Sequence, residues 1–239
     1  MLPSECPTSI EGERGRVRYE IVVRIMCISL FDNVFKQRIT VLKPVDLNLN
    51  SSYKVSAIIC LHNKNKFLMF YKSFQLPVSS EYIRSSCWPC WSGMIMCTLE
   101  IPFGAYISGQ LFKFSVLINN QSNSHTGGYS YEFKQKITYT ANQPVHEKRH
   151  ERNVLVSDSI SEQCLRFSNR LFEDAFTMPE IPPSTDSNSI VCVQYFLKVK
   201  VNMPDCCAKG VLKIPVIIGT IPITESLDAN QYTTVPLIE

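Results

Sequence analysis

The sequence predicts an all-β protein built as a β-sandwich. Several segments alternate apolar and polar residues with a period of two, which is the pattern of strands that bury one face. Glycine, proline and asparagine interrupt these segments at short intervals, and no stretch shows helical periodicity. Short strands at regular spacing, with turn residues between them, are typical of two packed antiparallel sheets.

A hairpin within residues 87–122 opens the predicted sandwich. Apolar residues of one parity define its two strands, Ile95, Cys97, Leu99 and Ile101 in the first and Phe112, Phe114, Val116 and Ile118 in the second. Lys113 and Ser115 have the opposite parity, and Gly104–Gly109 supplies the turn. We therefore predict that Cys97 is a core residue.

The same pattern continues through the rest of the chain. Further strands are predicted, in order, at Val17–Ile25, Phe35–Leu42, Tyr129–Tyr139, Val154–Val156, Cys164–Phe172, Val191–Val201 and Leu212–Ile218. Two apolar runs, Val55–Leu61 and Phe67–Tyr71, fit a strand pair, but no pattern identifies its neighbour in a sheet. We expect residues 87–224 to form one antiparallel sandwich of about seven or eight strands. Its predicted core includes Phe112, Phe114, Phe133, Tyr195 and Ile214.

Composition excludes several classes of protein. The chain has 239 residues, of which 45% are apolar and 19% charged, so it is globular rather than disordered. Its net charge of +3 is small and scattered, which does not favour nucleic acid as a partner. The first residues lack the apolar segment of a signal peptide, and the apolar run Val211–Ile223 is too short for a membrane helix. We expect a cytoplasmic protein whose ten cysteines are reduced.

No catalytic motif is present. The sequence lacks G-x-S-x-G, H-E-x-x-H, a phosphate-binding loop and a glycine-rich dinucleotide fingerprint. We predict that the protein is not an enzyme and that it uses no cofactor.

A cysteine pair, Cys87-Trp88-Pro89-Cys90, suggests two alternative chemistries. A redox dithiol needs a following helix, which the pattern does not offer. A zinc site needs four nitrogen or sulfur ligands, and Cys97 is the nearest further candidate. We predict a structural turn without stoichiometric metal or a catalytic dithiol. A disulfide-bonded, immunoglobulin-like extracellular module remains the alternative fold assignment.

A charged segment at residues 142–152 is predicted to be a loop. Lys148, Arg149 and Arg152 offer charge-assisted hydrogen bonds to a phosphate group or an acidic lipid. Glu147 and Glu151 are neighbours of these residues in the sequence and would neutralise part of the charge.

Several motifs resemble those of the alpha-arrestins, the arrestin-domain-containing proteins. In chain order these are L-P-S at 2–4, E-G-E-R-G-R-V-R-Y at 11–19, P-V-D-L-N at 44–48, S-G-M-I at 92–95, I-N-N-Q-S at 118–122, I-P-P at 181–183, V-x-V-x-Y-x-L-x-V at 191–199 and I-P-V-I-I-G-T-I-P-I at 214–223. The last of these is the most specific. The loop at 104–110 departs from the family's G-Y-x-P-G-E.

The resemblance implies an arrestin-like, immunoglobulin-type β-sandwich in four parts. These are a partial amino-terminal domain at 1–50, a linker or insertion at 51–86, a complete carboxy-terminal domain at 87–224 and a tail at 225–239. Removing residues 55–72 restores the family's spacing between D-L-N and P-V, so an insertion is expected there. With only two clear amino-terminal strands, residues 1–80 are expected to pack loosely or to borrow the surface of the second domain.

The resemblance also implies a function. Alpha-arrestins are cytoplasmic adaptors, located peripherally at the plasma membrane and endosomes, that bind receptor or transporter cargo and bring ubiquitin ligases to it. Other arrestins are further expected partners. Many members bind the ligase through P-P-x-Y, but here Thr185 stands in the tyrosine position after Pro182-Pro183-Ser184. Direct binding of a WW-domain ligase is therefore not expected.

Overall fold

The computed structural model describes residues 6–26, 33–49, 57–61, 67–71, 78–85, 93–143, 146–185, 189–203 and 210–223. Every regular element in these ranges is a strand. The strands are β1 (Ile10–Glu11), β2 (Arg16–Val17), β3 (Tyr19–Ile25), β4 (Asn33–Ile39), β5 (Ala57–Leu61), β6 (Phe67–Tyr71), β7 (Val78–Ser85), β8 (Met94–Ile101), β9 (Ala105–Ile107), β10 (Leu111–Asn120), β11 (Tyr129–Ala141), β12 (Glu147–Ile160), β13 (Ser168–Thr177), β14 (Val191–Val201) and β15 (Gly210–Gly219). No described helix has the length and apolarity needed to cross a membrane.

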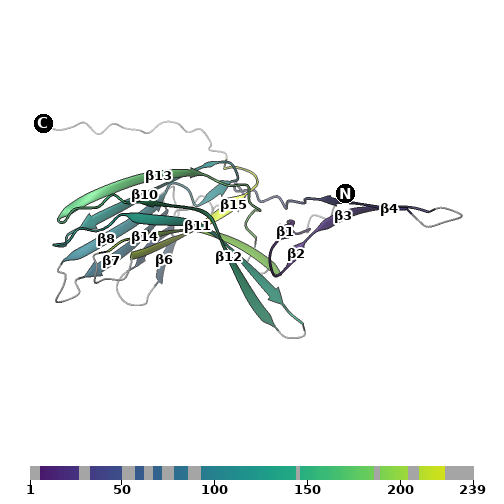
Figure 1. The fold of residues 1–239 in the computed structure, drawn as a ribbon, viewed down its shortest axis with the longest axis horizontal. Coiled ribbons are helices and arrows are strands. Elements are labelled where there is room, and N and C mark those ends of the chain that lie inside the picture. Colours follow the sequence, from purple (N-terminus) through teal and green to yellow (C-terminus); the bar gives the residue numbers. More distant parts are fainter. Residues whose placement is uncertain are drawn as a thin grey trace.

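Two sheets form the body of the molecule (Figure 1). One has six strands in the order β13-β10-β8-β7-β5-β6, and the other has five in the order β12-β11-β14-β15-β9. Most neighbours are antiparallel, whereas β5–β7 and β9–β15 are parallel. The predicted sandwich is therefore confirmed, but the expectation that it is wholly antiparallel was wrong at the β9–β15 pair. The short β9 lies within Gly104–Gly109, the segment predicted to be a turn, and pairs with β15.

The core consists of side chains from the inner faces of both sheets. All five residues predicted for it, Phe112, Phe114, Phe133, Tyr195 and Ile214, are buried. Aromatic rings dominate one part, where Phe112 stacks on Phe176 at a centroid distance of 4.9 Å and Phe133 stacks on Tyr195 at 5.9 Å. Such ring pairs contribute about 0.5–1.5 kcal/mol beyond the area that they bury. The core therefore follows directly from the alternating pattern.

The P-V-D-L-N motif attaches the amino-terminal segment to the end of β15. The Val45 amide donates to Thr220 Oγ1 at 2.8 Å, and the Thr220 amide donates back to the Val45 carbonyl at 3.0 Å. Leu47 is buried beside Gly219, where a Cβ atom would lie 2.5 Å from the Leu47 side chain. A residue without a side chain is required there, because any larger one would displace Leu47.

A second attachment joins the amino-terminal segment to the β11–β12 hairpin. The Glu13 amide and the Tyr139 hydroxyl both donate to Glu151 Oε2, at 3.1 Å and 2.8 Å. A Cβ at Gly12 would meet Tyr139. The amino-terminal segment is thus attached to the five-stranded sheet at two places, the end of β15 and the β11–β12 hairpin.

Strands β3 and β4 form a separate two-stranded ribbon. It projects away from the sandwich (Figure 1), and the pairing runs from Tyr19 opposite Ile39 to Ile25 opposite Asn33. Side chains along both strands are largely exposed. Among the described strands, β3 and β4 pair only with each other.

Three other segments differ from the sequence-based expectations. Residues 57–61 and 67–71 do pair as β5 and β6, and β5 also pairs with β7. Val78–Ser85 pairs with β8, so the sheet begins before the expected boundary at residue 87. The segment 142–152, expected to be a loop, lies mostly in β12, because its backbone pairs with β11; most of its side chains are exposed, but that of Glu151 is buried.

Candidate binding face

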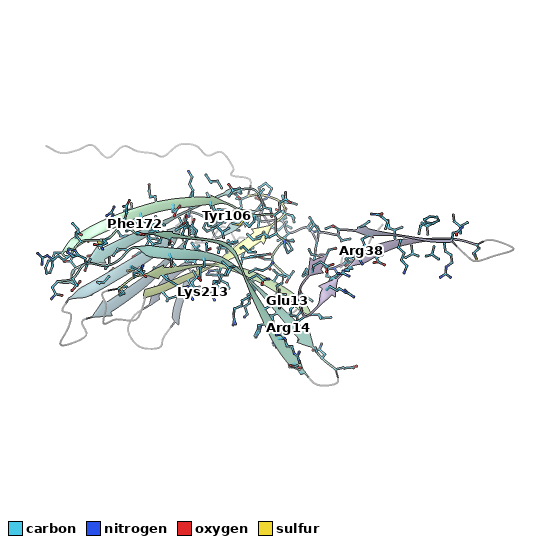
Figure 2. All side chains as sticks on the ribbon, viewed as in Figure 1. Glu13, Arg14, Arg38, Tyr106, Phe172 and Lys213 are labelled. Carbon is cyan, nitrogen blue, oxygen red and sulfur yellow. The ribbon has the colours of Figure 1, made fainter. Side chains whose placement is uncertain are left out.

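The outer face of the five-stranded sheet carries a concentration of positive charge. Core residues occupy one parity of its strands, so the other parity points outward. We define the basic face as the six outward cations Lys134, Lys136, Arg152, Lys198, Lys200 and Lys213. These residues come from β11, β12, β14 and β15, and Lys213 is labelled on this face in Figure 2.

The strand register places like charges directly opposite one another. Lys136 lies opposite Arg152, and Lys198 lies opposite Lys213. Directly opposed like charges destabilise a sheet by a few tenths to about 1 kcal/mol per pair. Among the described residues, none of these four cations forms an ion pair. We call them the cation quartet.

The remaining two cations of the basic face share one carboxylate. Glu132 accepts a hydrogen bond from Lys200 at 2.6 Å and forms an ion pair with Lys134 at 2.7 Å. The two ammonium groups, with Lys134 contributing more, lower the pKa of the Glu132 carboxyl to about 2. Glu132 also lies directly opposite Lys198 in the strand register, but its two ion pairs are with Lys134 and Lys200 rather than with a member of the quartet.

Within the quartet, the pKa of Lys213 is lowered by its surroundings. Its pKa lies below the ordinary value, chiefly because the ammonium is partly buried and further because Lys136, Arg152 and Lys198 are positive. Its Nζ also lies 3.8 Å from the centroid of the Phe196 ring, where a cation is attracted by the aromatic quadrupole. The four cations are therefore close enough to repel one another, and Lys213 is held in place.

A groove of about 700 Å³ runs between the basic face and the amino-terminal segment. Lys136 and Lys213 line it from the sheet, and Arg16 and Lys43 line it from the opposite wall. None of the described residues that line the groove is acidic. Apolar side chains form much of the remaining wall, including Ile10, Val17, Val191, Val193 and Pro215. The groove thus combines a positive lining with apolar contact surface.

The three residues predicted for phosphate or lipid contact separate in the structure. Lys148 and Arg152 share the parity of Lys136, so they extend the basic face along the hairpin. Arg149 has the opposite parity, and its Nε donates to Glu147 at 2.8 Å. The expected neutralisation by glutamate therefore applies to Arg149 but not to Arg152.

Most of the quartet was not singled out by sequence reasoning. Lys136 and Lys198 alternate with apolar residues along the predicted strands, which puts them on the polar side, but the sequence does not indicate which strands are neighbours. The register alone brings Lys198 opposite Lys213 and Lys136 opposite Arg152. The sequence feature that indicates the basic face is lysine at outward-facing positions of three strands: two in β11, two in β14 and one in β15.

Of the three cysteines considered for a metal or redox site, Cys97 lies in the core, and Cys87 and Cys90 lie outside the described residues. Cys97 is buried, as predicted, and burial together with the nearby Cys164 raises the pKa of its thiol to about 12. Such a thiol is protonated at neutral pH, so it is a poor nucleophile. Cys87 and Cys90 lie outside the described residues, so the prediction for them stays a prediction. Within the described ranges no three metal-ligating side chains gather.

Comparison with known proteins gives two family matches. Residues 91–223 match the model for the carboxy-terminal domain of arrestin (or S-antigen), and residues 1–48 match the model for its amino-terminal domain. These matches cover β8–β15 of the sandwich and the amino-terminal segment that lines the groove, but not β5–β7.

Individual proteins are similar over most of this chain. Arrestin domain-containing protein 1 of Rattus norvegicus is 21% identical and that of Homo sapiens 22% identical, each over 228 residues. In both cases the match covers 95% of this chain and 46% of the relative, so the chain spans about half the length of these relatives. A solved structure, the sporulation control protein Spo0M of Bacillus subtilis, has a TM-score of 0.43 and 12% identity over 54% of this chain and 50% of that one.

Proposed function

The chain belongs to the arrestin family, and from this premise we propose that it is an adaptor that acts by binding other proteins rather than by catalysis. Its cargo is a membrane receptor or transporter, and its role is in endocytosis, endosomal sorting and ubiquitin-linked downregulation. We further propose that it works in the cytoplasm, peripherally at the plasma membrane and endosomes. The motif resemblance and the family matches support the proposal.

The cation quartet indicates how the protein would bind its cargo. Four positive side chains face one another and form no ion pair among the described residues, and their repulsion costs free energy that a bound anion would offset. Phosphate and carboxylate oxygens accept charge-assisted hydrogen bonds from lysine and arginine. We therefore assign the basic face and its groove to an acidic or phosphorylated cytoplasmic segment of the cargo.

The groove also suits an extended peptide. Its apolar wall can contact side chains of a bound segment, while Arg16 and Lys43 face the quartet members Lys136 and Lys213 across it. Positive charge on both walls would hold a negatively charged chain along the middle. Binding should therefore weaken as salt concentration rises, because exposed charges are screened.

A titration of the purified chain tests this assignment. We expect a phosphorylated peptide to bind, and the double substitution Lys198→Gln with Lys213→Gln to weaken binding roughly tenfold or more, since charged hydrogen bonds contribute about 1.5–3 kcal/mol each. Lys113→Gln is the matched control, because Lys113 is an exposed lysine on β10 in the other sheet. Equal binding by all three chains would contradict the assignment. Binding to anionic vesicles but not to the peptide would show that the basic face binds lipid rather than cargo.

A further inference from the structure

The end of β12 carries exposed serines on the side of the basic face. Ser157 and Ser159 are both exposed, and β12 is an edge strand of the five-stranded sheet. Ser157 lies opposite Glu132 and Ser159 lies opposite Ser130. Directly opposed residues lie on the same side of a sheet, so both serines point outward with the cations of that face. A charge added to either serine would therefore lie on the basic face.

The position of Ser159 is remote from the amino-terminal segment. That segment is attached through Tyr139 and Glu151, toward the other end of the β11–β12 pair. Ser159 pairs with Ser130, next to the last pair at Tyr129. At about 3.4 Å per residue, Ser130 and Tyr139 lie about 30 Å apart along β11. The exposure of Ser159 is thus a property of the carboxy-terminal sandwich.

The strand register aligns Ser159 with Lys200. Ser130 separates them, because it lies opposite Ser159 on one side and opposite Lys200 on the other. Two strand spacings of about 4.8 Å put the Cα atoms of Ser159 and Lys200 about 10 Å apart. The residue between them is small, and lysine carries its ammonium group on a flexible four-carbon stem. An anion on Ser159 is therefore within reach of Lys200.

Glu132 connects Lys200 to the cation quartet. In the unmodified chain Lys200 donates to Glu132 at 2.6 Å. Glu132 lies directly opposite Lys198, which in turn lies opposite Lys213. Glu132 is also diagonal to Ser159, and diagonal neighbours on one face of a sheet are about 7–8 Å apart. A negative group on Ser159 would thus attract Lys200 and repel Glu132 at the same time.

The sequence around Ser159 suits a protein kinase that selects acidic substrates. Asp158 precedes the serine and Glu162 follows it by three residues. No lysine or arginine occurs between Arg152 and Arg166. Such a segment is complementary in charge to a basic substrate groove. The end of a strand also opens more readily than its centre, which gives a kinase access to the serine.

We propose that Ser159 is a phosphorylation site that weakens anion binding at the basic face, an inference that rests on the cargo-binding function proposed above. A kinase transfers the γ-phosphoryl group of a nucleoside triphosphate to Ser159 Oγ. The bond from the γ-phosphorus to the bridging oxygen breaks, a nucleoside diphosphate leaves, and the hydroxyl proton passes to the base of the kinase. The phosphate binds Lys200 in place of Glu132, and Glu132 pairs with Lys198, so the quartet loses one of its cations.

Incubation of the full chain with an acid-directed kinase and ATP tests the site. We expect mass spectrometry to find phosphate on Ser159, and Ser159→Ala to lose that modification. Ser161→Ala is the matched control and should keep it, because Ser161 is a neighbouring exposed serine beyond the end of β12. A folded chain that takes no phosphate at Ser159 would overturn the proposal.

Phosphorus NMR of the phosphorylated chain tests the contact with Lys200 without any cargo. An ordinary phosphoserine has a second pKa of about 6. A nearby ammonium group favours the dianion, so we expect a lower pKa for the phosphate on Ser159 and a return toward the ordinary value in Lys200→Gln. Lys113→Gln, in the other sheet, should leave this pKa unchanged. A phosphate whose pKa ignores Lys200→Gln would contradict the contact.

Titration with the phosphorylated peptide tests the effect on cargo binding. We expect phosphorylation of Ser159 to weaken binding roughly tenfold in the wild-type chain, but less than about threefold in Glu132→Gln, which cannot neutralise Lys198. Equal binding by the phosphorylated and unmodified chains would overturn the effect, and an equal loss in Glu132→Gln would contradict the route through Glu132. An unmodified chain that does not bind the peptide would sink the cargo assignment, whereas the phosphorus titration judges the phosphate contact separately.

Discussion

Phe114 shows how a single alternating position determines stability. The side chain is 3% exposed and its ring lies 4.9 Å, centroid to centroid, from the ring of Tyr131 in the opposite sheet. The sequence predicted its burial because Lys113 and Ser115 on either side are polar. The partner ring could not be predicted, because contacts across the two sheets depend on how the sheets are stacked.

We expect Phe114→Ala to lower the free energy of unfolding by about 3–5 kcal/mol, because it removes a buried ring and leaves a cavity. Chemical denaturation followed by tryptophan fluorescence measures this. Leu117→Ala is the control on the same strand, since Leu117 is 40% exposed and should cost much less. Equal effects of the two substitutions would place Phe114 outside the core.

Glu132 should make stability depend on acid pH. Its carboxyl has a pKa of about 2 in the folded chain against an ordinary value of 4.5, so the stabilisation is complete above pH 4.5 and disappears as the pH falls toward 2. The stability difference between wild type and Glu132→Gln should therefore shrink over that range. Denaturant titrations at several pH values measure it, with Glu173→Gln as an exposed carboxylate that forms no ion pair. A difference independent of pH would contradict the ion pairs with Lys134 and Lys200.

At the scale of elements, the alternating pattern worked where one face of a strand is buried. It predicted the cores of β8, β10, β11, β14 and β15. It failed at 142–152, because this segment has no apolar residues at alternate positions: its inward-facing Glu151 is buried as the acceptor of hydrogen bonds from the Glu13 amide and the Tyr139 hydroxyl. The register of β11 against β12, which creates half of the cation quartet, was equally inaccessible, since it depends on pairing rather than on pattern.

The segment at 181–185 is an element without regular structure but with fixed contacts. The Tyr195 hydroxyl donates to the Pro182 carbonyl at 2.7 Å, and the Ser184 amide donates to the Ile218 carbonyl at 2.8 Å. Thr185 Oγ1 accepts from the Val193 amide at 2.7 Å. This stretch is therefore attached to the sheet, whereas a WW domain binds its ligand as an exposed polyproline II helix.

We expect an isolated WW domain to bind neither the folded chain nor a peptide of residues 179–187. The peptide lacks tyrosine at the position of Thr185, and the folded chain also holds the prolines against β14 and β15. Fluorescence anisotropy measures both, and the peptide with Thr185→Tyr is the positive control. Micromolar binding of the unmodified peptide would refute the expectation that no WW-domain ligase is recruited directly.

At the scale of the whole molecule, the amino-terminal segment links three features. Its P-V-D-L-N motif fastens it to β15, its Arg16 and Lys43 complete the positive groove, and its β3–β4 ribbon extends away from the sandwich. Figure 2 shows Arg38 on that ribbon, remote from the labelled Lys213. The groove and the ribbon are therefore separate surfaces that can be altered independently.

The most direct test of the central claim is recovery of membrane proteins by the chain itself. We expect the wild-type protein, incubated with detergent-solubilised membranes, to co-precipitate receptors or transporters. The Lys198→Gln and Lys213→Gln double variant should lose most of that recovery, and the Lys113→Gln control should retain it, because only the double variant removes charge from the quartet. Equal recovery by the double variant and the wild type would show that the basic face does not bind the cargo.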